Sequence, residues 1–374
     1  MAPKIHMVDL HSQYLCIKTE IDQAMQAVLN FTAFIQGPQV QQFAEALKNY
    51  VGAGYCISCA NGTDALQIAM MALDLKPGDE VILPVHTYVA TAEVIALLGL
   101  TPVFIDVNAD TFNLDVDQLE KNITSKTKAI VPVHLYGQCA DMEPILKIAS
   151  KHNLFVIEDV AQALGAVYTF SNGKKMRAGT TGTIGTTSFF PSKNLGCFGD
   201  GGAIFTNDGQ LAEKVKMMAN HGQHVKYHHD VIGVNSRLYT LQAAVLLVKL
   251  KYLNEYEAKR NAVADFYDRT LSNVPQVKVP VRAKNSSHVF HQYTLQVEKR
   301  DELKKYLEEK GVPSMIYYPV PLHFQKAYKK VGFAEGSFPV TEKLSKAVLS
   351  LPIHTEMKPD ELEYIAEQVR NFYT

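Results

Sequence analysis

Short apolar runs alternate with amphipathic stretches between residues 55 and 158, and this alternation restricts the possible folds more than any other feature of the chain. The apolar runs are rich in β-forming residues and are bounded by Gly, Pro or Asp, which predicts strands at residues 55–59, 80–84, 102–107, 129–134 and 154–158. The stretches between them predict helices at residues 63–73, 88–98, 116–122 and 142–152. Such a succession is typical of an α/β protein with a mostly parallel sheet that helices cover on both faces.

The rest of the chain has other patterns, which divide it into three regions. Residues 1–50 predict an N-terminal arm with helices, and residues 51–255 predict a large α/β domain that ends in a long buried helix at 238–253. Residues 256–374 predict a smaller C-terminal α+β domain. Its expected elements are strands at 277–281 and 292–297 and helices at 303–310 and 361–371.

The composition argues against several classes of function. A formal net charge of -1 over 374 residues gives no electrostatic reason to bind nucleic acid or an acidic membrane. No apolar run reaches the roughly 18 residues that a membrane-spanning helix needs, and the first residues lack the apolar core of a signal peptide. The five cysteines are dispersed and odd in number, which favours reduced thiols and a cytoplasmic protein.

Two groups of potential metal ligands have simpler explanations. Cys56 and Cys59 have CxxC spacing, but they lie in a predicted strand without a second ligand pair, which favours structural thiols over a zinc or redox motif. A later stretch contains four histidines, which are His221, His224, His228 and His229. Because Asp230 is the one nearby acid and no cysteine is close, this pattern favours a solvated or interface loop over a zinc site.

One lysine stands between two predicted strand ends. Residues 187–196 (TSFFPSKNLG) begin as a β-like run that stops at Pro191, because proline cannot donate to a strand ladder. An ammonium group at Lys193 that faces a cleft would have a lowered pKa, and its free amine could attack a carbonyl. A loop lysine beside a buried sheet explains the same stretch equally well.

An acid and an amide follow the strand predicted at 154–158. Asp159 stands at the end of a buried strand, where a carboxylate is costly unless it is paired. A protonated pyridine nitrogen would pair with it, and Gln162 could donate to a ring oxygen. Asp159 precedes Lys193 by 34 residues (193 minus 159), which fits neighbouring strands of one sheet.

Two other strand-to-helix turns offer groups that could bind a ligand. Residues 61–66 (NGTDAL) place Gly62 and Thr63 at a helix N-terminus, which suits a phosphate group. An Asn-Gly turn with a Thr N-cap explains this stretch equally well. Tyr88 opens the helix predicted at 88–98, where its ring could stack on a planar ligand or pack in the core.

A phosphate seat, a stacking ring, an acid and a lysine together indicate one cofactor, pyridoxal 5'-phosphate (PLP). The chain resembles the DegT/DnrJ/EryC1/StrS family of nucleotide-sugar aminotransferases over nearly its whole length. Six motifs occur in family order, at 61–66 (NGTDAL), 158–162 (EDVAQ), 188–193 (SFFPSK), 199–203 (GDGGA), 233–238 (GVNSRL) and 318–323 (YPVPLH). The resemblance implies the fold type I of PLP-dependent aminotransferases, with a mostly parallel seven-stranded sheet and helices on both faces.

The resemblance also implies which residues hold the cofactor. Lys193 would bind it through its amine and later transfer the proton. Asp159 would hold the pyridine nitrogen, Gln162 would lie on the side of the phenolic oxygen, and Tyr88 would stack on the ring. The phosphate would be bound by Gly62, Thr63 and Ser188, and by Asn235 from a second subunit, so that a homodimer shares its active sites.

Other residues would contact the substrate. Arg237 would cross the subunit interface, and the C-terminal wall of the sugar pocket would contain Tyr317, Tyr318 and His323. The chain departs from the family pattern at Tyr239, where an acidic residue is usual, and at Tyr317, where histidine is frequent. Both departures concern substrate contacts and leave the expected cofactor unchanged.

Within the family, the stretches 55–63, 135–141 and 221–223 resemble enzymes that aminate C3 of UDP-2-acetamido-2-deoxy-3-keto-glucuronate. This likeness implies glutamate as amino donor, 2-oxoglutarate as its product, and a role in making O-antigen or another surface polysaccharide. The alternative is a C3 or C4 aminotransferase that acts on a UDP- or dTDP-linked 6-deoxy keto-sugar. Some members of the family have become dehydratases or regulatory binders. Lys193 argues against a dehydratase, which usually has histidine at this position, and a purely binding role would leave Asp159, Ser188 and Lys193 without a reason to converge.

Overall fold

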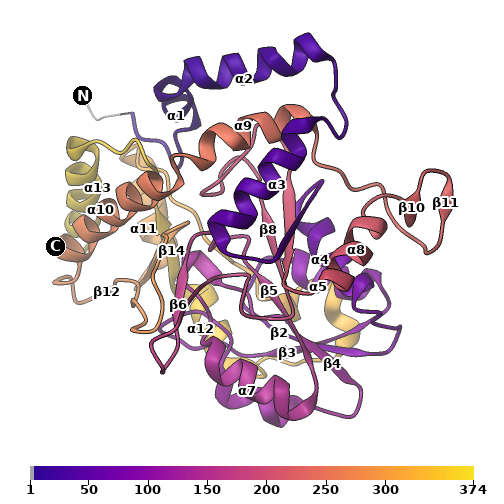
Figure 1. Ribbon diagram of the computed structural model, residues 1–374. Coiled ribbons are helices and arrows are strands. Elements are labelled where there is room, and N and C mark those ends of the chain that lie inside the picture. The colour runs from indigo at the N-terminus through magenta and orange to yellow at the C-terminus, as the bar shows by residue number, and fades with distance from the viewer. Residues whose placement is uncertain (1–3) are drawn as a thin grey trace.

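A seven-stranded sheet organises the computed structural model, which describes residues 4–374 (Figure 1). Its strands, in spatial order, are β1 (Tyr55–Cys59), β9 (Gly202–Thr206), β8 (Ile184–Ser188), β5 (Phe155–Asp159), β4 (Thr127–Ile130), β2 (Glu80–Pro84) and β3 (Thr101–Ile105). Four neighbouring pairs are parallel, and they are β8–β5, β5–β4, β4–β2 and β2–β3. Strand β9 runs antiparallel to both of its neighbours, β8 and β1. The mostly parallel, seven-stranded sheet predicted from the sequence is confirmed.

Helices cover both faces of this sheet, because successive side chains along each strand point to opposite faces. On one face, Ile82 and Ile130 belong to a core with α3 (Pro38–Val51), α7 (Met142–His152) and α9 (Thr240–Leu250). On the other face, Val81 and Val131 belong to a core with α4 (Gly62–Ala72), α5 (Ala90–Leu97) and α8 (Gly209–Met218). Shorter elements on the rim are α6 (Val116–Leu119), β6 (Val167–Thr169) and β7 (Lys175–Arg177).

Local sequence signals set where several helices begin. Asn61 caps α4, since its side-chain oxygen accepts a hydrogen bond from the Asp64 amide at 2.8 Å. Asp208 caps α8 in the same way through two backbone amides. Pro38 and Pro359 begin α3 and α13 (Pro359–Tyr373), at a position where the missing amide hydrogen removes no helical bond.

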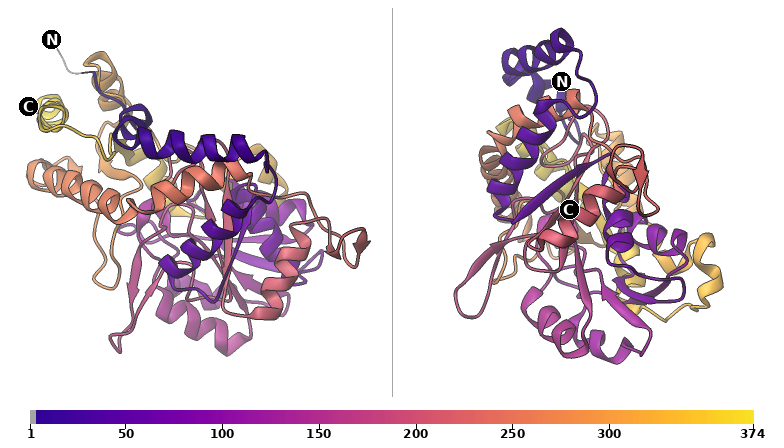
Figure 2. Two further views of the ribbon diagram at one scale, coloured as in Figure 1. Left: turned by 45° about the horizontal axis from the view of Figure 1, so that its top comes forward. Right: turned by 45° about the vertical axis from the view of Figure 1, so that its right-hand side comes forward.

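The N-terminal arm lies along the outside of the helical layer. It consists of α1 (Leu10–Cys16) and α2 (Lys18–Phe31), and the apolar side of α2 packs on α9 through Ile21, which contacts the cluster of Val245 and Val248. A hairpin of β10 (Gln223–Val225) and β11 (His228–His229) projects from the right-hand side of the molecule in both views of Figure 2. This hairpin carries the histidine-rich stretch, and residues 4–374 contain no group of three or more side chains placed to hold a metal ion.

The C-terminal part builds a separate core around a three-stranded antiparallel sheet. Its elements are α10 (Leu253–Leu271), β12 (Val277–Lys278), β13 (Tyr293–Val297), α11 (Arg300–Glu309), α12 (Pro339–Ala347), β14 (Val348–Leu351) and α13. The helix predicted at 238–253 is α9, which is shorter than predicted because the chain turns at residues 251–252 before α10. The domain boundary predicted at residues 255–256 falls inside α10 and stays a prediction. None of the helices described in residues 4–374 is long and apolar enough to cross a bilayer.

Candidate active site

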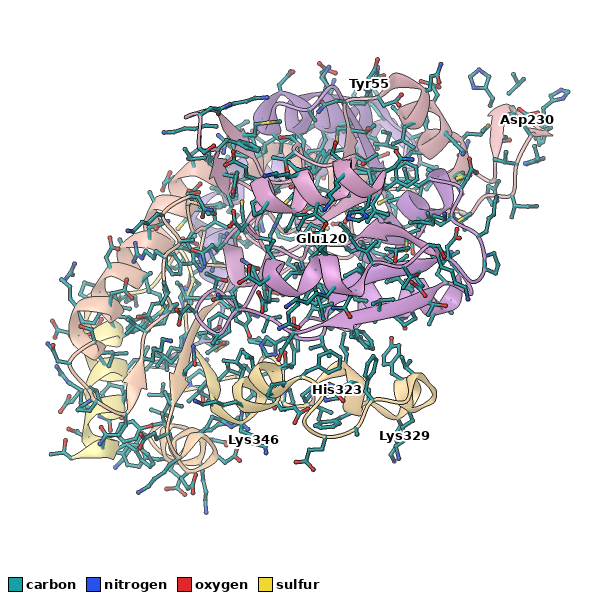
Figure 3. The ribbon with its side chains drawn as sticks, turned by 90° about the horizontal axis from the view of Figure 1, so that it is seen from below. Tyr55, Glu120, Asp230, His323, Lys329 and Lys346 are labelled. Atoms are coloured by element: carbon teal, nitrogen blue, oxygen red, sulfur yellow. The ribbon has the colours of Figure 1, made fainter. Side chains whose placement is uncertain are left out.

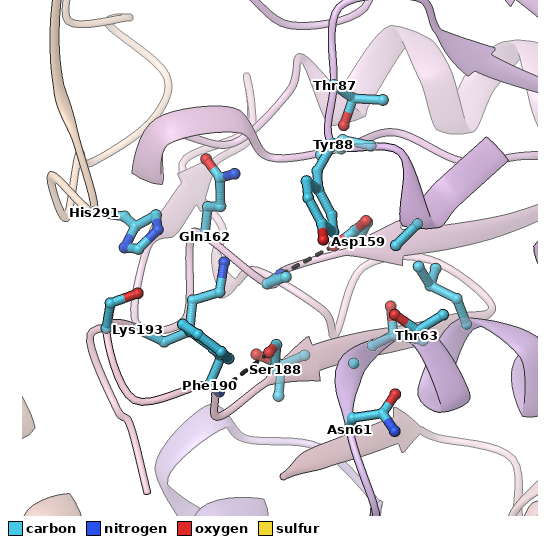
Figure 4. A pocket seen from close by; sticks show the side chains of 18 of the residues that line it. Asn61, Thr63, Thr87, Tyr88, Asp159, Gln162, Ser188, Phe190, Lys193 and His291 are labelled. Carbon is cyan, nitrogen blue, oxygen red and sulfur yellow. Dashed lines mark hydrogen bonds between the residues drawn. The ribbon is translucent and has the colours of Figure 1, made fainter. Parts of the chain in front are cut away.

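A cavity of about 670 Å³ lies where the carboxyl ends of β5 and β8 meet the N-terminus of α4 (Figure 4). Its walls come from residues 61–66, from the turns after β2, β5 and β8, and from two C-terminal segments at 291–292 and 317–318. Parallel strands that lie side by side end at one edge of the sheet, and ligands of α/β proteins bind at that edge. The cavity is therefore the candidate site.

Lys193 reaches this cavity from the loop between β8 and β9 (Figure 4). The loop is tight, since the Lys193 amide donates to the Phe190 carbonyl at 2.8 Å. A Cβ at Gly196 would lie 2.2 Å from the Pro191 carbonyl oxygen, so the loop closes only around glycine. Burial lowers the pKa of the Lys193 ammonium to about 8, although the negative charge of Asp159 works in the opposite direction. About one-tenth of this amine is therefore uncharged at pH 7.

Asp159 ends β5 with its side chain almost fully buried. One carboxylate oxygen accepts a hydrogen bond from the Thr91 hydroxyl at 2.9 Å, and the other accepts from the Ala161 amide at 3.1 Å. Both donors are neutral, so they fix the orientation of the carboxylate without neutralising its charge. A carboxylate oxygen has lone pairs left for a further donor, and the side chain lines the cavity.

The neighbouring acid, Glu158, faces away from the cavity into a closed hydrogen-bond network. Its oxygens accept from the backbone amides of Gly179, Thr181 and Gly182 at 2.9, 2.7 and 2.6 Å, and from His134 Nε2 at 2.9 Å. His134 Nδ1 accepts from a backbone amide at 3.0 Å, which leaves the ring proton on Nε2. Burial alone would raise the pKa of the Glu158 carboxyl group, but the hydrogen bonds from these donors outweigh it and lower the pKa. The network ties the end of β5 to the loop that leads into β8.

We expect Glu158→Gln to destabilise the protein by about 1.5–3 kcal/mol, the usual contribution of hydrogen bonds to a charged group. The amide keeps the shape of the side chain, but its NH₂ group meets donors where an oxygen accepted hydrogen bonds. Denaturant unfolding measures the loss, with Glu363→Gln on the exposed face of α13 as the matched control. Folding lowers the pKa of Glu158, so its ionised carboxylate adds to the free energy of unfolding at pH values above the unfolded-state pKa. This stabilisation is lost as the pH falls through the folded-state pKa. A wild-type free energy of unfolding in Glu158→Gln would contradict this account.

An anion seat lies on the other side of the cavity, at the N-terminus of α4. The amides of Gly62 and Thr63 stand in the first turn, before helical hydrogen bonding begins, and the helix dipole adds partial positive charge there. A Cβ at Gly62 would lie 2.7 Å from Ser188 Cβ, so the missing side chain lets the helix start lie against the end of β8. Two amide groups and the Ser188 hydroxyl thus border one part of the cavity.

Polar and aromatic side chains form the remaining walls. Gln162 is oriented by two bonds, because its oxygen accepts from the Tyr136 amide at 2.7 Å and its NH₂ group donates to the Tyr318 hydroxyl at 3.1 Å. The rings of Tyr88 and Tyr318 lie 6.0 Å apart, and Tyr88 is 57% exposed. Tyr317 lines the same wall. Tyr88 therefore presents its ring to the cavity, and the core-packing explanation does not hold.

The comparison with protein families decides the class of this protein. The model of the DegT/DnrJ/EryC1/StrS aminotransferase family matches residues 15–370. The chain belongs to this family. It is an aminotransferase, as the six ordered motifs of the sequence indicated.

Individual relatives match this aminotransferase over almost its full length. It is 48% identical over 367 residues to the UDP-2-acetamido-2-deoxy-3-oxo-D-glucuronate aminotransferase of Pseudomonas aeruginosa, covering 98% of this chain and 100% of that protein. It is 39% identical over 370 residues to the dTDP-3-amino-3,4,6-trideoxy-alpha-D-glucose transaminase of Streptomyces venezuelae, covering 99% of this chain and 96% of that protein. Among solved structures, NtdA from Bacillus subtilis with bound cofactor PMP has a TM-score of 0.87 and 35% identity, covering 94% of this chain and 81% of that one.

The cofactor of the aminotransferase is PLP, and the residues present suit it. PLP carries an aldehyde, a pyridine nitrogen and a phosphate. The cavity holds an amine on Lys193, a buried carboxylate on Asp159 and the amide seat beside Ser188. The predicted cofactor is confirmed by the family, and the three complementary groups lie in one cavity.

The structure places three of the predicted residues outside this cavity. Asn235 is exposed, and the Arg237 guanidinium donates to the side chain of Asn220 at 3.3 Å. His323 is buried in the C-terminal segment, where its Nε2 lies 3.1 Å from the Glu342 carboxylate (Figure 3). Its imidazole is turned toward Glu342, and His323 is not among the residues that line the cavity, so its contact with the sugar stays a prediction.

Several residues of the site were missed by the sequence analysis, among them Thr91, His291 and Gln292. Thr91 orients Asp159, and its position in the first turn after Tyr88 was the available signal. His291 and Gln292 line the cavity from an irregular segment of the C-terminal part. No periodicity marks that segment, so only the three-dimensional structure brings it to the site.

Proposed function

We propose that this aminotransferase moves an amino group from glutamate to C3 of a UDP-linked 2-acetamido-2-deoxy-3-keto-glucuronate. The observation that carries the proposal is the 48% identity, over the full length, to a protein named for this reaction. The product would be a diacetamido uronic acid for O-antigen or another surface polysaccharide, and the reaction would take place in the cytoplasm.

The chain's own residues would hold the cofactor and manage its protonation. Asp159, oriented by Thr91, would accept a hydrogen bond from the pyridine nitrogen and keep it protonated. The phosphate would rest on Gly62, Thr63 and Ser188. When bound, PLP supplies an electron sink that stabilises negative charge on the carbon next to nitrogen.

Lys193 would act as the general base and acid of the reaction. Its ammonium pKa of about 8 lies near neutral pH, where proton transfer in both directions is efficient. The amine would bind the cofactor, be released as the amino donor enters, and then carry the α-proton of glutamate. The same group would return a proton to the sugar carbon in the second half of the reaction.

We propose a homodimer in which Asn235 and Arg237 of one copy complete the cavity of the other. Of the residues that line the cavity within 4–374, Lys193 is the single Lys or Arg, beside three acids, Asp64, Asp159 and Asp200. A nucleotide diphosphate and a uronate need additional positive charge. Exposed apolar residues on and next to the β10–β11 hairpin fit a buried interface, and they are Val225, Tyr227 and Ile232.

A second candidate is an aminotransferase for a 6-deoxy keto-sugar linked to UDP or dTDP. The full-length relative named for a dTDP-linked trideoxy sugar supports it. The two candidates differ at C6, where the first substrate carries a carboxylate and the second a methyl group.

Purified enzyme with glutamate should therefore aminate the UDP-linked 3-keto-uronate faster than neutral UDP- or dTDP-linked keto-sugars. Hydrogen bonds to a charged group contribute about 1.5–3 kcal/mol, which corresponds to roughly 10–100-fold in kcat/KM. Product formation is measured by mass spectrometry of the amino sugar across this panel. A preference for a neutral 6-deoxy keto-sugar would decide for the second candidate, and amination of none of them would reject both.

A further inference from the structure

The loop between β8 and β9 carries Lys193 and closes on its own backbone. At its base, the Phe189 amide donates to the Gly201 carbonyl at 2.7 Å, which continues the pairing of the two strands. One step further in, the Cys197 amide donates to the Phe189 carbonyl at 2.9 Å. Residues 190–196 therefore form a short closed loop, and the position of the Lys193 amine depends on how firmly this loop is held.

The peptide group between Gly196 and Cys197 is fixed at both of its polar ends. Its N–H belongs to Cys197 and makes the bond to Phe189, and its carbonyl oxygen accepts a hydrogen bond from Lys249 Nζ at 2.9 Å. Because Gly196 is buried, this carbonyl needs a partner within the protein. Lys249 is the donor that supplies it, at the point where the loop closes.

A second side chain of α9 holds the next part of the loop. Gln242 stands seven residues before Lys249 (249 minus 242), which is about two helical turns and places both on the same face of the helix. Its side-chain oxygen accepts from the Phe198 amide at 2.8 Å, and its NH₂ group donates to the Phe198 carbonyl at 3.3 Å. One face of α9 therefore binds backbone groups of the loop on the C-terminal side of Lys193.

The charge of Lys249 is costly at this place in the fold. Lys249 is 2% exposed, and no carboxylate within residues 4–374 forms an ion pair with it. An apolar side chain of similar length would fill the same space without a buried ammonium group. Burial lowers the pKa of Lys249 to about 8, so most of this side chain is still protonated at pH 7. The charge thus supplies a strong, directed hydrogen bond to the Gly196 carbonyl.

We propose that Lys249 is a positioning residue for Lys193. By holding the peptide group between Gly196 and Cys197, Lys249 fixes the closing point of the loop, and the loop keeps the Lys193 amine at the cavity. Lys249 is not among the residues that line the cavity, so it acts through the loop and does not touch cofactor or substrate. This inference rests on the proposed function, in which Lys193 binds the cofactor and transfers the proton.

The substitution Lys249→Met tests the hold on the loop, since methionine has a similar length and lacks the donor. In the purified protein, amide hydrogen exchange of residues 194–198 is expected to be roughly 10-fold faster in the variant, the effect of one hydrogen bond from a charged group. Exchange in the strands of the seven-stranded sheet should keep its wild-type rate. Mass spectrometry of peptic fragments measures both. Unchanged exchange in residues 194–198, or a similar increase throughout the chain, would overturn the proposal.

The rate at which PLP attaches tests what this hold does for the amine. When PLP is added to the PLP-free protein, visible absorption appears as the Lys193 nitrogen bonds to the aldehyde carbon and the aldehyde oxygen leaves as water with the two protons of the amine. At saturating PLP, the first-order rate constant is expected to fall roughly 10-fold in Lys249→Met, with an unchanged amplitude. A first-order rate constant does not depend on how much of the protein is folded. A lower amplitude with a wild-type rate constant would therefore show a role in folding alone and would overturn the proposal.

Three further variants assign the effect to the Lys249 hydrogen bond. Lys249→Arg keeps a charged donor and should recover part of the rate that Lys249→Met loses. Gln242→Met removes neutral hydrogen bonds from the same face of α9 and should slow attachment only roughly 3-fold, because neutral bonds are about half as strong. Lys251→Met, at an exposed lysine paired with Glu20, should leave both measurements unchanged. Melting temperatures show whether each variant is folded.

Neither measurement uses a substrate, so this test can fail separately from the proposed function. Slower attachment in Lys249→Met, together with no amination of any keto-sugar by the wild-type enzyme, would reject the function and support the positioning role. Wild-type attachment and exchange in Lys249→Met, together with amination by the wild-type enzyme, would support the function and reject the positioning role.

Discussion

Replacement of Lys193 with alanine is expected to abolish amination, with a loss of about 10²–10⁴-fold from general acid–base catalysis alone. The amine is the single Lys or Arg side chain that lines the cavity within residues 4–374, so no neighbouring lysine or arginine can take its place. The folded protein should still bind PLP through the anion seat and Asp159, but without the visible absorption of the lysine-bound cofactor. Initial rates and the absorption spectrum measure the two effects.

Two further lysine variants make this test specific. Lys193→Arg keeps a positive charge and a similar length, but a guanidinium does not lose its proton in proteins and should be equally inactive. Lys346→Ala removes an exposed lysine of α12 and should leave the rate unchanged. Retained activity in Lys193→Ala or in Lys193→Arg would show that the amine of residue 193 is not the proton carrier.

The parts of the site that lie on neighbouring strands could be predicted from the sequence. Asp159 ends β5, Ser188 ends β8, and Gly62 begins the helix that packs against β8. A parallel sheet brings these ends to one edge, so the alternation of strands and helices was sufficient to place them together. Residues whose position follows from a regular element are therefore accessible to sequence analysis.

The parts of the site and fold that the sequence did not predict depend on contacts between segments that are distant along the chain. His291 reaches the cavity because Arg260 and Asn194 hold an irregular segment in place, and no local pattern records those bonds. The end of α9 at Leu250 is similar, because the turn at Lys251 and Tyr252 contains no Gly or Pro that would mark it in the sequence. The strand β14 was missed because its fully buried residues form a short apolar run directly after α12, where periodicity does not separate helix from strand.

Replacement of Asp159 with asparagine is expected to lower the rate of amination about 10²–10⁴-fold while the fold is retained. The asparagine oxygen can accept from the Ala161 amide, and its NH₂ group can donate to the Thr91 hydroxyl, which rotates to accept. The negative charge that would keep the pyridine nitrogen protonated is lost. Removing one partner of a buried charge pair costs about 3–5 kcal/mol, and each 1.36 kcal/mol is a tenfold change in rate. Single-turnover rates with glutamate measure the effect directly.

A comparison with Thr91→Val separates the charge of Asp159 from its orientation. That variant keeps the carboxylate and removes one neutral hydrogen bond, so a loss of only about 2- to 13-fold is expected. Asp159→Asn should also lower the pKa of Lys193 further, because the negative charge that raises this pKa is gone. The lysine pKa can be followed without turnover, through the pH dependence of amine acylation in the PLP-free protein. If Asp159→Asn and Thr91→Val were equally active and left that pH dependence at its wild-type position, the charge of residue 159 would have no part in the reaction.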